Sequence, residues 1–139
     1  MLVTSRSFAE YVAFFALDPD RLPRRVLDCS AGTSGFVAGA RARGSDAVAD
    51  GSFDLAVCSH LLFTWANVFD VAWHEAALRE MTRVATEVRV FPLVHQGSGE
   101  PVGFLGALRE RLTHVETGIV TVPYAFQVGA DQMLLVSRL

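Results

Sequence analysis

One stretch near the N-terminus constrains the fold of this chain more than any other: RVLDCSAGTSGF, residues 25–36. A short apolar run ends in Asp28, and a run of small residues and then a helical pattern follow, which is typical of a strand, a tight turn and a helix. Small residues at such a turn let a ligand approach the backbone, and the next helix directs its free N–H groups toward the same point. Since ligands of open α/β sheets bind beside the carboxyl ends of the strands, we expect a binding site here.

Strand and helix patterns alternate along the rest of the chain. A capping box at Ser7 and Glu10 opens a predicted helix over 7–17, in which aromatic residues recur at helical spacing. Further helices are predicted over 33–43, over 71–85 and after Pro101, and strands over 25–29, 46–49, 53–58, 87–91, 115–122 and 132–137. The last two strands, over 115–122 and 132–137, could pair with each other in the antiparallel direction. This alternation predicts an α/β fold with a mostly parallel sheet.

Length, charge and hydropathy bound the class of protein. The 139 residues fit a single domain spanning 1–139, of which 51% is hydrophobic, with a net charge of −3. No apolar run approaches the roughly 18 residues of a membrane span, and the N-terminus lacks the pattern of a signal peptide, so we expect a cytoplasmic protein without a membrane partner. The twelve basic residues are all arginines and are dispersed, so the sequence predicts no nucleic-acid-binding surface.

Several stretches resemble motifs of class I S-adenosylmethionine-dependent methyltransferases. VLDCSAG, residues 26–32, is similar to motif I, and SFDLAVCSHLLF, residues 52–63, is similar to the fourth strand and its loop facing the cofactor. HEAALREMTRVA, residues 74–85, and EVRVFPL, residues 87–93, resemble the helix and fifth strand that follow. PYAFQ and GADQM, in 123–133, are similar to the closing hairpin of bacterial relatives. The order and spacing agree over most of the chain.

The resemblance implies a Rossmann-like three-layer sandwich whose sheet has seven strands, the last of them antiparallel. It implies that S-adenosylmethionine lies across the first, second and fourth strands. Asp28 would then help to order the methionine amino end, and Asp50 is the candidate acid for the ribose hydroxyls. The remaining cofactor contacts implied are Ser30, Ala31, Gly32 and Ser34 at the bend, and Ser59 after the fourth strand. His60 would lie beside the methionine portion or the substrate.

His60 is the candidate catalytic residue, as a general base or a substrate contact, and a structural hydrogen bond is the alternative. Positioning dominates methyl transfer from a sulfonium, so a strong base is optional. The expected function is therefore methyl transfer to a small molecule with S-adenosylhomocysteine as product, and ring closure or other displacement with the same cofactor stays open. The alternative is a degenerate, non-catalytic domain that serves as an interaction or assembly module.

The junction over 44–53 departs from the family pattern. A predicted strand over 46–49 is followed almost at once by the strand that begins at Phe53. Two parallel strands need a crossover of a dozen or more residues, so this cannot be a normal crossover, and Asp50-Gly51 is a hairpin signal instead. Three explanations are open: a stretch absent from this sequence, a true deletion, or exchange between the subunits of a homodimer.

The cysteines and histidines complete the set of candidate residues. Cys29 and Cys58 each fall at a strand end, where we expect buried thiols, with a disulfide on oxidation as the alternative if the strands are neighbours. The four histidines, His60, His74, His95 and His114, match no metal-ligand spacing, so the sequence predicts no metal site.

Overall fold

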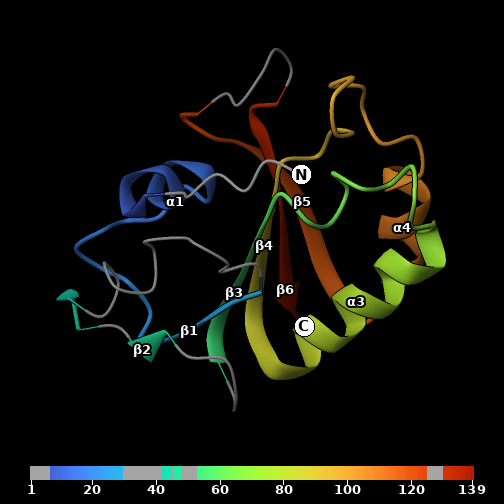
Figure 1. The fold of residues 1–139 in the computed structure, drawn as a ribbon. Helices are drawn as coiled ribbons and strands as arrows, with labels where there is room; N and C mark the ends of the chain where they lie inside the picture. Colours follow the sequence, from blue (N-terminus) through green and yellow to red (C-terminus); the bar gives the residue numbers. More distant parts are fainter. Residues whose placement is uncertain (1–6, 30–41, 45, 48–52, 125–129) are drawn as a thin grey trace.

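The computed structural model describes residues 7–29, 42–44, 46–47, 53–124 and 130–139. Its elements in chain order are α1 (Phe8–Phe14), β1 (Arg25–Asp28), β2 (Asp46–Ala47), β3 (Phe53–Ser59), α3 (Val71–Val84), β4 (Ala85–Phe91), α4 (Leu105–Arg111), β5 (Val115–Thr121) and β6 (Gln132–Arg138) (Figure 1). The helix predicted over 33–43 lies almost wholly outside the described residues. Among those residues, no helix is long and apolar enough to cross a membrane.

The strands form one six-stranded sheet in the order β2-β1-β3-β4-β6-β5. The pairs β1–β2, β1–β3 and β3–β4 are parallel, whereas β6 runs antiparallel to both of its neighbours, β4 and β5. The predicted mostly parallel α/β sheet with an antiparallel last strand is therefore confirmed. The described part of the chain contains six strands rather than the seven that the resemblance implied.

β3 lies near the middle of the sheet, and this position explains why its sequence is mostly apolar. All its residues but one are buried, since both faces of the strand are covered. The exception, Asp54, lies next to the beginning of the strand and bonds to Arg25 at the beginning of β1. A run of apolar residues without alternation is thus the expected signature of this central strand.

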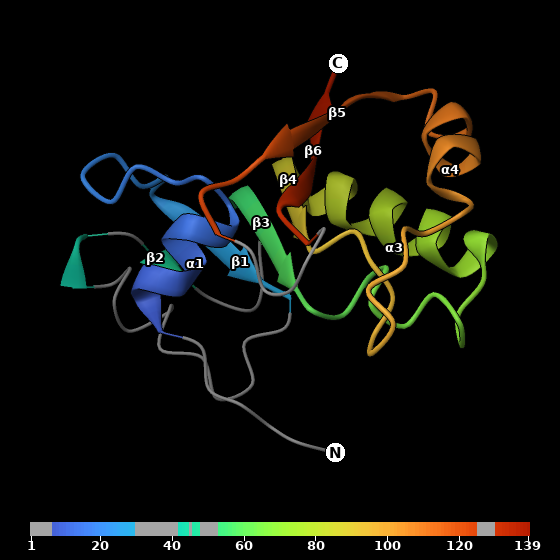
Figure 2. The ribbon, with the colours of Figure 1, turned by 90° about the horizontal axis from the view of Figure 1, so that it is seen from above.

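Helices cover both faces of the sheet (Figures 1 and 2). On one face, α1 contributes Tyr11, Phe14 and Phe15 to a core that includes Val26, Leu55, Val57, Phe91 and Met133. On the other face, α3 and α4 contribute Leu78, Met81 and Leu108 to a core that includes Ala56, Cys58, Val88, Val90 and Leu134. Strands β1, β3, β4 and β6 therefore contribute side chains to both cores.

The predicted capping box opens α1. The Ser7 N–H donates to Glu10 Oε2 at 2.7 Å, and the Glu10 N–H donates to Ser7 Oγ at 3.2 Å. The helix ends at Phe14, earlier than the predicted Leu17. Its C-cap residue, Phe15, and the next residue, Ala16, offer their carbonyl groups to the guanidinium of Arg89 on β4.

The hairpin predicted at Asp50-Gly51 is wrong, because β2 and β3 lie on opposite sides of β1 and are both parallel to it. The register puts Ala47 and Leu55 level with the same β1 residue, Val26. Phe53 therefore lies about 12 Å from Ala47, counting two strand spacings and two residue rises. Six residue steps reach about 20 Å when extended. This register is therefore compatible with the five residues between β2 and β3, and residues 48 and 49 of the predicted strand lie outside the described residues.

Candidate functional site

The carboxyl ends of β1 and β3 meet at one edge of the sheet. Asp28 ends β1 and is level with Val57 on β3, two residues before Ser59. The structure thus brings together three of the predicted site residues, Asp28, Ser59 and His60. The other five predicted contacts, Ser30, Ala31, Gly32, Ser34 and Asp50, lie outside the described residues and stay predictions.

The carboxylate of Asp28 is held from the α1 side of the sheet. The hydroxyl of Tyr11 donates to Asp28 Oδ1 at 3.5 Å, and the Tyr11 side chain is buried, with 1% of its surface exposed. A buried tyrosine hydroxyl needs a hydrogen-bond partner, and a carboxylate is a strong acceptor. Helix α1 therefore orients the acid that the sequence assigned to the cofactor.

The backbone turns sharply directly after β3. His60 has a φ of 57°, in the left-handed region that only a few per cent of non-glycine residues adopt, histidine more often than most. Its N–H donates to the Phe91 carbonyl at 2.8 Å, and its Nδ1 lies 2.5 Å from the Ser59 hydroxyl oxygen. Such a conformation persists only where the surrounding structure enforces it, and it is concentrated at functional sites. The Ser59–His60 contact fits the structural role, and catalysis by His60 stays a prediction.

An aromatic cluster lies next to the His60 ring. The ring packs edge-on against Phe14 and Phe91, with centroid distances of 5.2 and 5.7 Å. Phe14 and Phe91 stack at 4.8 Å, and Tyr124 meets Phe14 edge-on at 4.6 Å. The Tyr124 hydroxyl lies 3.5 Å from Glu10 Oε1, which connects the cluster to the first turn of α1. His60 is thus oriented by α1, β4 and the segment that follows β5.

A second histidine fixes the loop between β3 and α3. His74 is fully buried, its Nδ1 lies 2.8 Å from the Asp70 carbonyl oxygen, and its Nε2 accepts from the Phe63 N–H at 2.9 Å. These bonds define a neutral imidazole with the proton on Nδ1. Burial lowers the pKa of His74, although the Asp70 carbonyl acts in the opposite direction.

Sequence reasoning gave His74 no role beyond excluding it from a metal site. Helix α3 buries His74, Leu78, Met81 and Thr82, whereas the adjacent Trp73 is 36% exposed. Helical spacing could have indicated that His74 is buried, because it stands four residues before the apolar Leu78 and therefore lies on the same face of the helix. Within the described ranges, no three metal-ligating side chains of the His, Cys, Asp or Glu type lie together.

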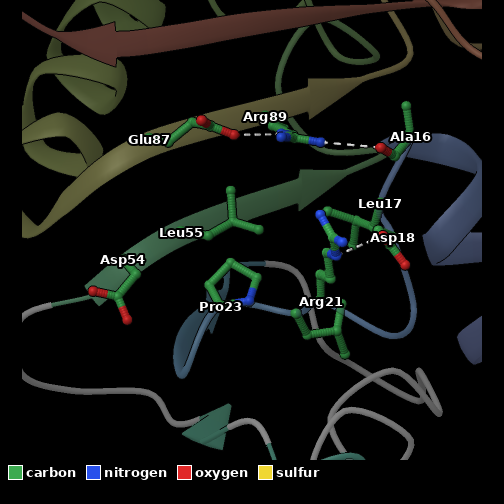
Figure 3. A pocket seen from close by; sticks show the side chains of 10 residues that line it. Ala16, Leu17, Asp18, Arg21, Pro23, Asp54, Leu55, Glu87 and Arg89 are labelled. Carbon is green, nitrogen blue, oxygen red and sulfur yellow. Dashed lines mark hydrogen bonds and ion pairs between the residues drawn. The ribbon is translucent and has the colours of Figure 1, made fainter.

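A cavity of about 280 Å³ lies elsewhere, against the amino-terminal halves of β3 and β4 (Figure 3). Charged side chains that line the cavity form ion pairs with one another: Arg89 pairs with Glu87 at 2.5 Å, and Arg21 lies 3.9 Å from Asp18. The Asp54 carboxylate at its edge pairs with Arg25. This cavity is separate from the edge that carries Asp28 and Ser59.

Comparisons with known proteins define the class of fold. No family model matches the chain. A solved structure of the 16S rRNA methylase RmtB is similar, with a TM-score of 0.50, 17% identity, and coverage of 94% of this chain and 61% of that one. The fold is therefore methyltransferase-like, and at this identity the likeness shows the fold alone.

A curated relative is also similar: "Uncharacterized protein MJ0045" of Methanocaldococcus jannaschii, 26% identical over 89 residues. The match covers 64% of this chain and 38% of the relative. The chain thus spans less than two thirds of the length of each of these two proteins.

Proposed function

We propose that this chain is an S-adenosylmethionine-dependent methyltransferase domain, or a related transferase or cyclase using the same cofactor, built as a Rossmann-like three-layer sandwich. The observation that carries the proposal is the position of Asp28 and Ser59 at the carboxyl ends of adjacent parallel strands. This is where α/β sheets bind nucleotide cofactors. The methyltransferase-like fold supports the same assignment.

The side chains at this edge suit the methionine end of the cofactor. A carboxylate such as Asp28 attracts an α-ammonium group, and the Ser59 hydroxyl can accept or donate a hydrogen bond beside it. When bound, the cofactor supplies an electrophilic methyl group on a sulfonium. The chain's own contribution is then orientation: Tyr11 holds Asp28, and Phe91 holds the backbone of His60.

We propose a small-molecule substrate in the cytoplasm rather than RNA. The printed title of the structural neighbour names 16S rRNA, but binding to RNA rests on a field of unpaired basic side chains. Six described arginines lie beside carboxylates of this chain: Arg21, Arg25, Arg79, Arg83, Arg89 and Arg111. Each carboxylate weakens the local positive potential, and the net charge of the chain is −3.

One observation favours the second candidate, a non-catalytic interaction or assembly module. Only five residues separate β2 from β3, where the family resemblance implies a further strand and a helix near the adenine. A site that orders the methionine end without these elements makes fewer contacts with the adenosine end. Weak affinity for the cofactor would be the consequence.

Titration calorimetry with S-adenosylhomocysteine tests the proposal. We expect wild-type protein to bind, Asp28→Asn to weaken binding about ten-fold or more, and Ser59→Ala to weaken it about three-fold. Asp54→Asn is the matched control, because Asp54 is a carboxylate at the opposite end of β3, and its affinity should equal that of wild type. Folded wild-type protein that binds neither S-adenosylhomocysteine nor S-adenosylmethionine would overturn the enzyme proposal and favour the module.

The substrate class has its own test. Wild-type protein is incubated with methyl-labelled S-adenosylmethionine and either total RNA or a panel of small phenols, amines and carboxylic acids. Label in the small-molecule fraction is expected, with Asp28→Asn as the control. Label in RNA instead would contradict the substrate proposed here.

A further inference from the structure

The register of β1 and β3 brings the two cysteines side by side. Asp28 on β1 is level with Val57 on β3, and the Cys29 N–H donates to the Val57 carbonyl at 2.9 Å. One residue further along both segments, Cys29 is level with Cys58. These residues are 29 positions apart in the sequence, and only the pairing of the strands makes them neighbours.

Both thiols lie on the same face of the sheet. Asp28 and Val57 face α1, since Asp28 meets Tyr11 and Val57 belongs to the core beneath α1. Side chains alternate along a strand, so the next residue on each segment points to the other face. Accordingly, Cys58 belongs to the core beneath α3, and Cys29 packs against that same core.

The spacing of level residues in a sheet suits a disulfide. Neighbouring strands lie about 4.8 Å apart, and the Cα atoms of disulfide-bonded cysteines are roughly 4.4–6.8 Å apart. Cys29 directly follows the last residue of β1. Rotation of the two side chains about their Cα–Cβ bonds would bring the sulfur atoms to bonding distance.

We propose that Cys29 and Cys58 form an intrachain disulfide when the protein meets a peroxide, and that this crosslink controls the candidate cofactor site. Burial raises the pKa of the Cys29 thiol to about 11, so the reactive thiolate is a small fraction at neutral pH and the first step is slow there. That thiolate attacks a peroxide oxygen and becomes a sulfenic acid, as the peroxide is reduced to water or an alcohol. The Cys58 sulfur then attacks the sulfenic sulfur and expels water. Two thiols lose two hydrogen atoms and two electrons in total, and hydrogen peroxide yields two molecules of water.

The burial of the two thiols sets the order of these steps. Cys29 is half-buried, whereas Cys58 is fully buried, with 0% of its surface exposed. The oxidant therefore reaches Cys29 first, and Cys58 acts as the resolving thiol without meeting the oxidant. A buried resolving thiol next to a reachable one protects the first sulfur from further oxidation.

The crosslink lies directly beneath the site. Cys29 follows Asp28, and Cys58 precedes Ser59, so one bond would fix the separation of the two segments that carry these side chains. We expect the oxidised protein to bind S-adenosylhomocysteine at least three-fold more weakly than the reduced protein. This effect on affinity rests on the proposed function, whereas formation of the disulfide does not.

The experiment treats the full chain with hydrogen peroxide, alkylates the remaining thiols and measures intact mass and the crosslinked peptides. Wild type should lose two hydrogen atoms, take up no alkylating agent and recover both thiols with dithiothreitol. Cys58→Ala should instead add oxygen at Cys29, and Cys29→Ala should keep Cys58 as a thiol. A thermal melt of each variant checks that it is folded.

Three results would contradict, in turn, the disulfide, its effect on the candidate site and the proposed function. Oxygen added to Cys29 of wild type, with Cys58 still open to alkylation after unfolding, overturns the disulfide. A disulfide without a change in affinity overturns its control of the site. Reduced wild type that does not bind S-adenosylhomocysteine overturns the proposed function and leaves the disulfide result standing.

Discussion

The backbone N–H of Phe63 donates to His74 Nε2 at 2.9 Å, which ties the loop after β3 to the first turn of α3. Phe63 has a φ of 65°, and its ring stacks on the His74 ring at 5.1 Å. The loop that begins with His60 is therefore anchored at its far side by a buried imidazole. Such an anchor keeps the edge of the sheet beside Ser59 in one conformation.

Replacing His74 tests this anchor. His74→Leu keeps a similar volume but leaves the buried Phe63 N–H without its imidazole acceptor, whereas the Asp70 carbonyl keeps its bond from the backbone N–H of residue 74. We expect the free energy of unfolding to fall by about 2–4 kcal/mol, measured by urea denaturation. His95→Leu in the loop after β4 is the control and should change it by less than about 0.5 kcal/mol. A loss equal to that of the control would show that the His74 bonds do not stabilise the fold.

The same histidine predicts how stability depends on pH. Burial lowers the pKa of His74 in the folded state, so the unfolded chain binds the proton first as pH falls. The stabilisation is therefore complete above the unfolded pKa of about 6.5 and is lost progressively as pH falls below it. The carboxyl groups of Glu75 and Glu80, whose pKa values are lowered by Arg79 and Arg83, titrate below this window.

Urea denaturation at pH 8, 7, 6 and 5 measures this dependence. We expect the midpoint of wild type to fall between pH 7 and pH 5 more steeply than that of His74→Gln, which has no titrating group at this position. Equal slopes for the two proteins would mean that His74 is protonated alike in the folded and unfolded states.

The hydroxyl of Tyr11 is predicted to matter for binding and not for folding. Tyr11→Phe keeps the ring, which packs against Phe14 and Phe15 at 5.8 and 5.6 Å, and removes the hydroxyl that donates to Asp28. We expect affinity for S-adenosylhomocysteine to fall about five-fold, as loss of about 1 kcal/mol implies. Tyr124→Phe removes a hydroxyl near Glu10 instead and should leave affinity unchanged. Equal affinities of both variants and wild type would remove Tyr11 from the site.

The reactivity of Cys29 should depend steeply on pH. Burial, followed by the charge of Asp28, raises the pKa of the Cys29 thiol to about 11. In a Cys58→Ala background, the rate of alkylation by iodoacetamide should rise about ten-fold per pH unit between pH 7.5 and 9.5, because the thiolate is the nucleophile. Asp28→Asn in that background should react faster at each pH. A rate that levels off near pH 8.5 would indicate an ordinary exposed thiol.

Local patterns in the sequence predicted helices and strands well where the apolar residues followed one clear pattern. The capping box at Ser7 located the beginning of α1, and the apolar run from Leu55 to Cys58 located the central strand β3. The helix after β3 was predicted in place, but the pattern of the sequence did not show that His74 is buried while the adjacent Trp73 is partly exposed. Burial of a polar ring depends on hydrogen-bond partners from another segment, here Phe63 and Asp70.

Only part of the candidate site could be predicted, because some of its contacts come from segments that are distant in the sequence. Motif resemblance selected Asp28, Ser59 and His60, which the structure places at one edge of the sheet. Resemblance did not find Tyr11, because its hydroxyl reaches Asp28 from a helix 17 residues earlier in the chain. A contact of that kind leaves no spacing that can be recognised along the sequence.

The sequence by itself determined the alternation of strands and helices and the beginning of the first helix, because these depend on residues that are near one another in the chain. The tertiary structure alone decided that β2 and β3 flank β1 without forming a hairpin, that Cys29 stands beside Cys58, and that His74 holds the loop after β3. Strand register and burial are set by packing between distant segments, and local propensity carries little information about either.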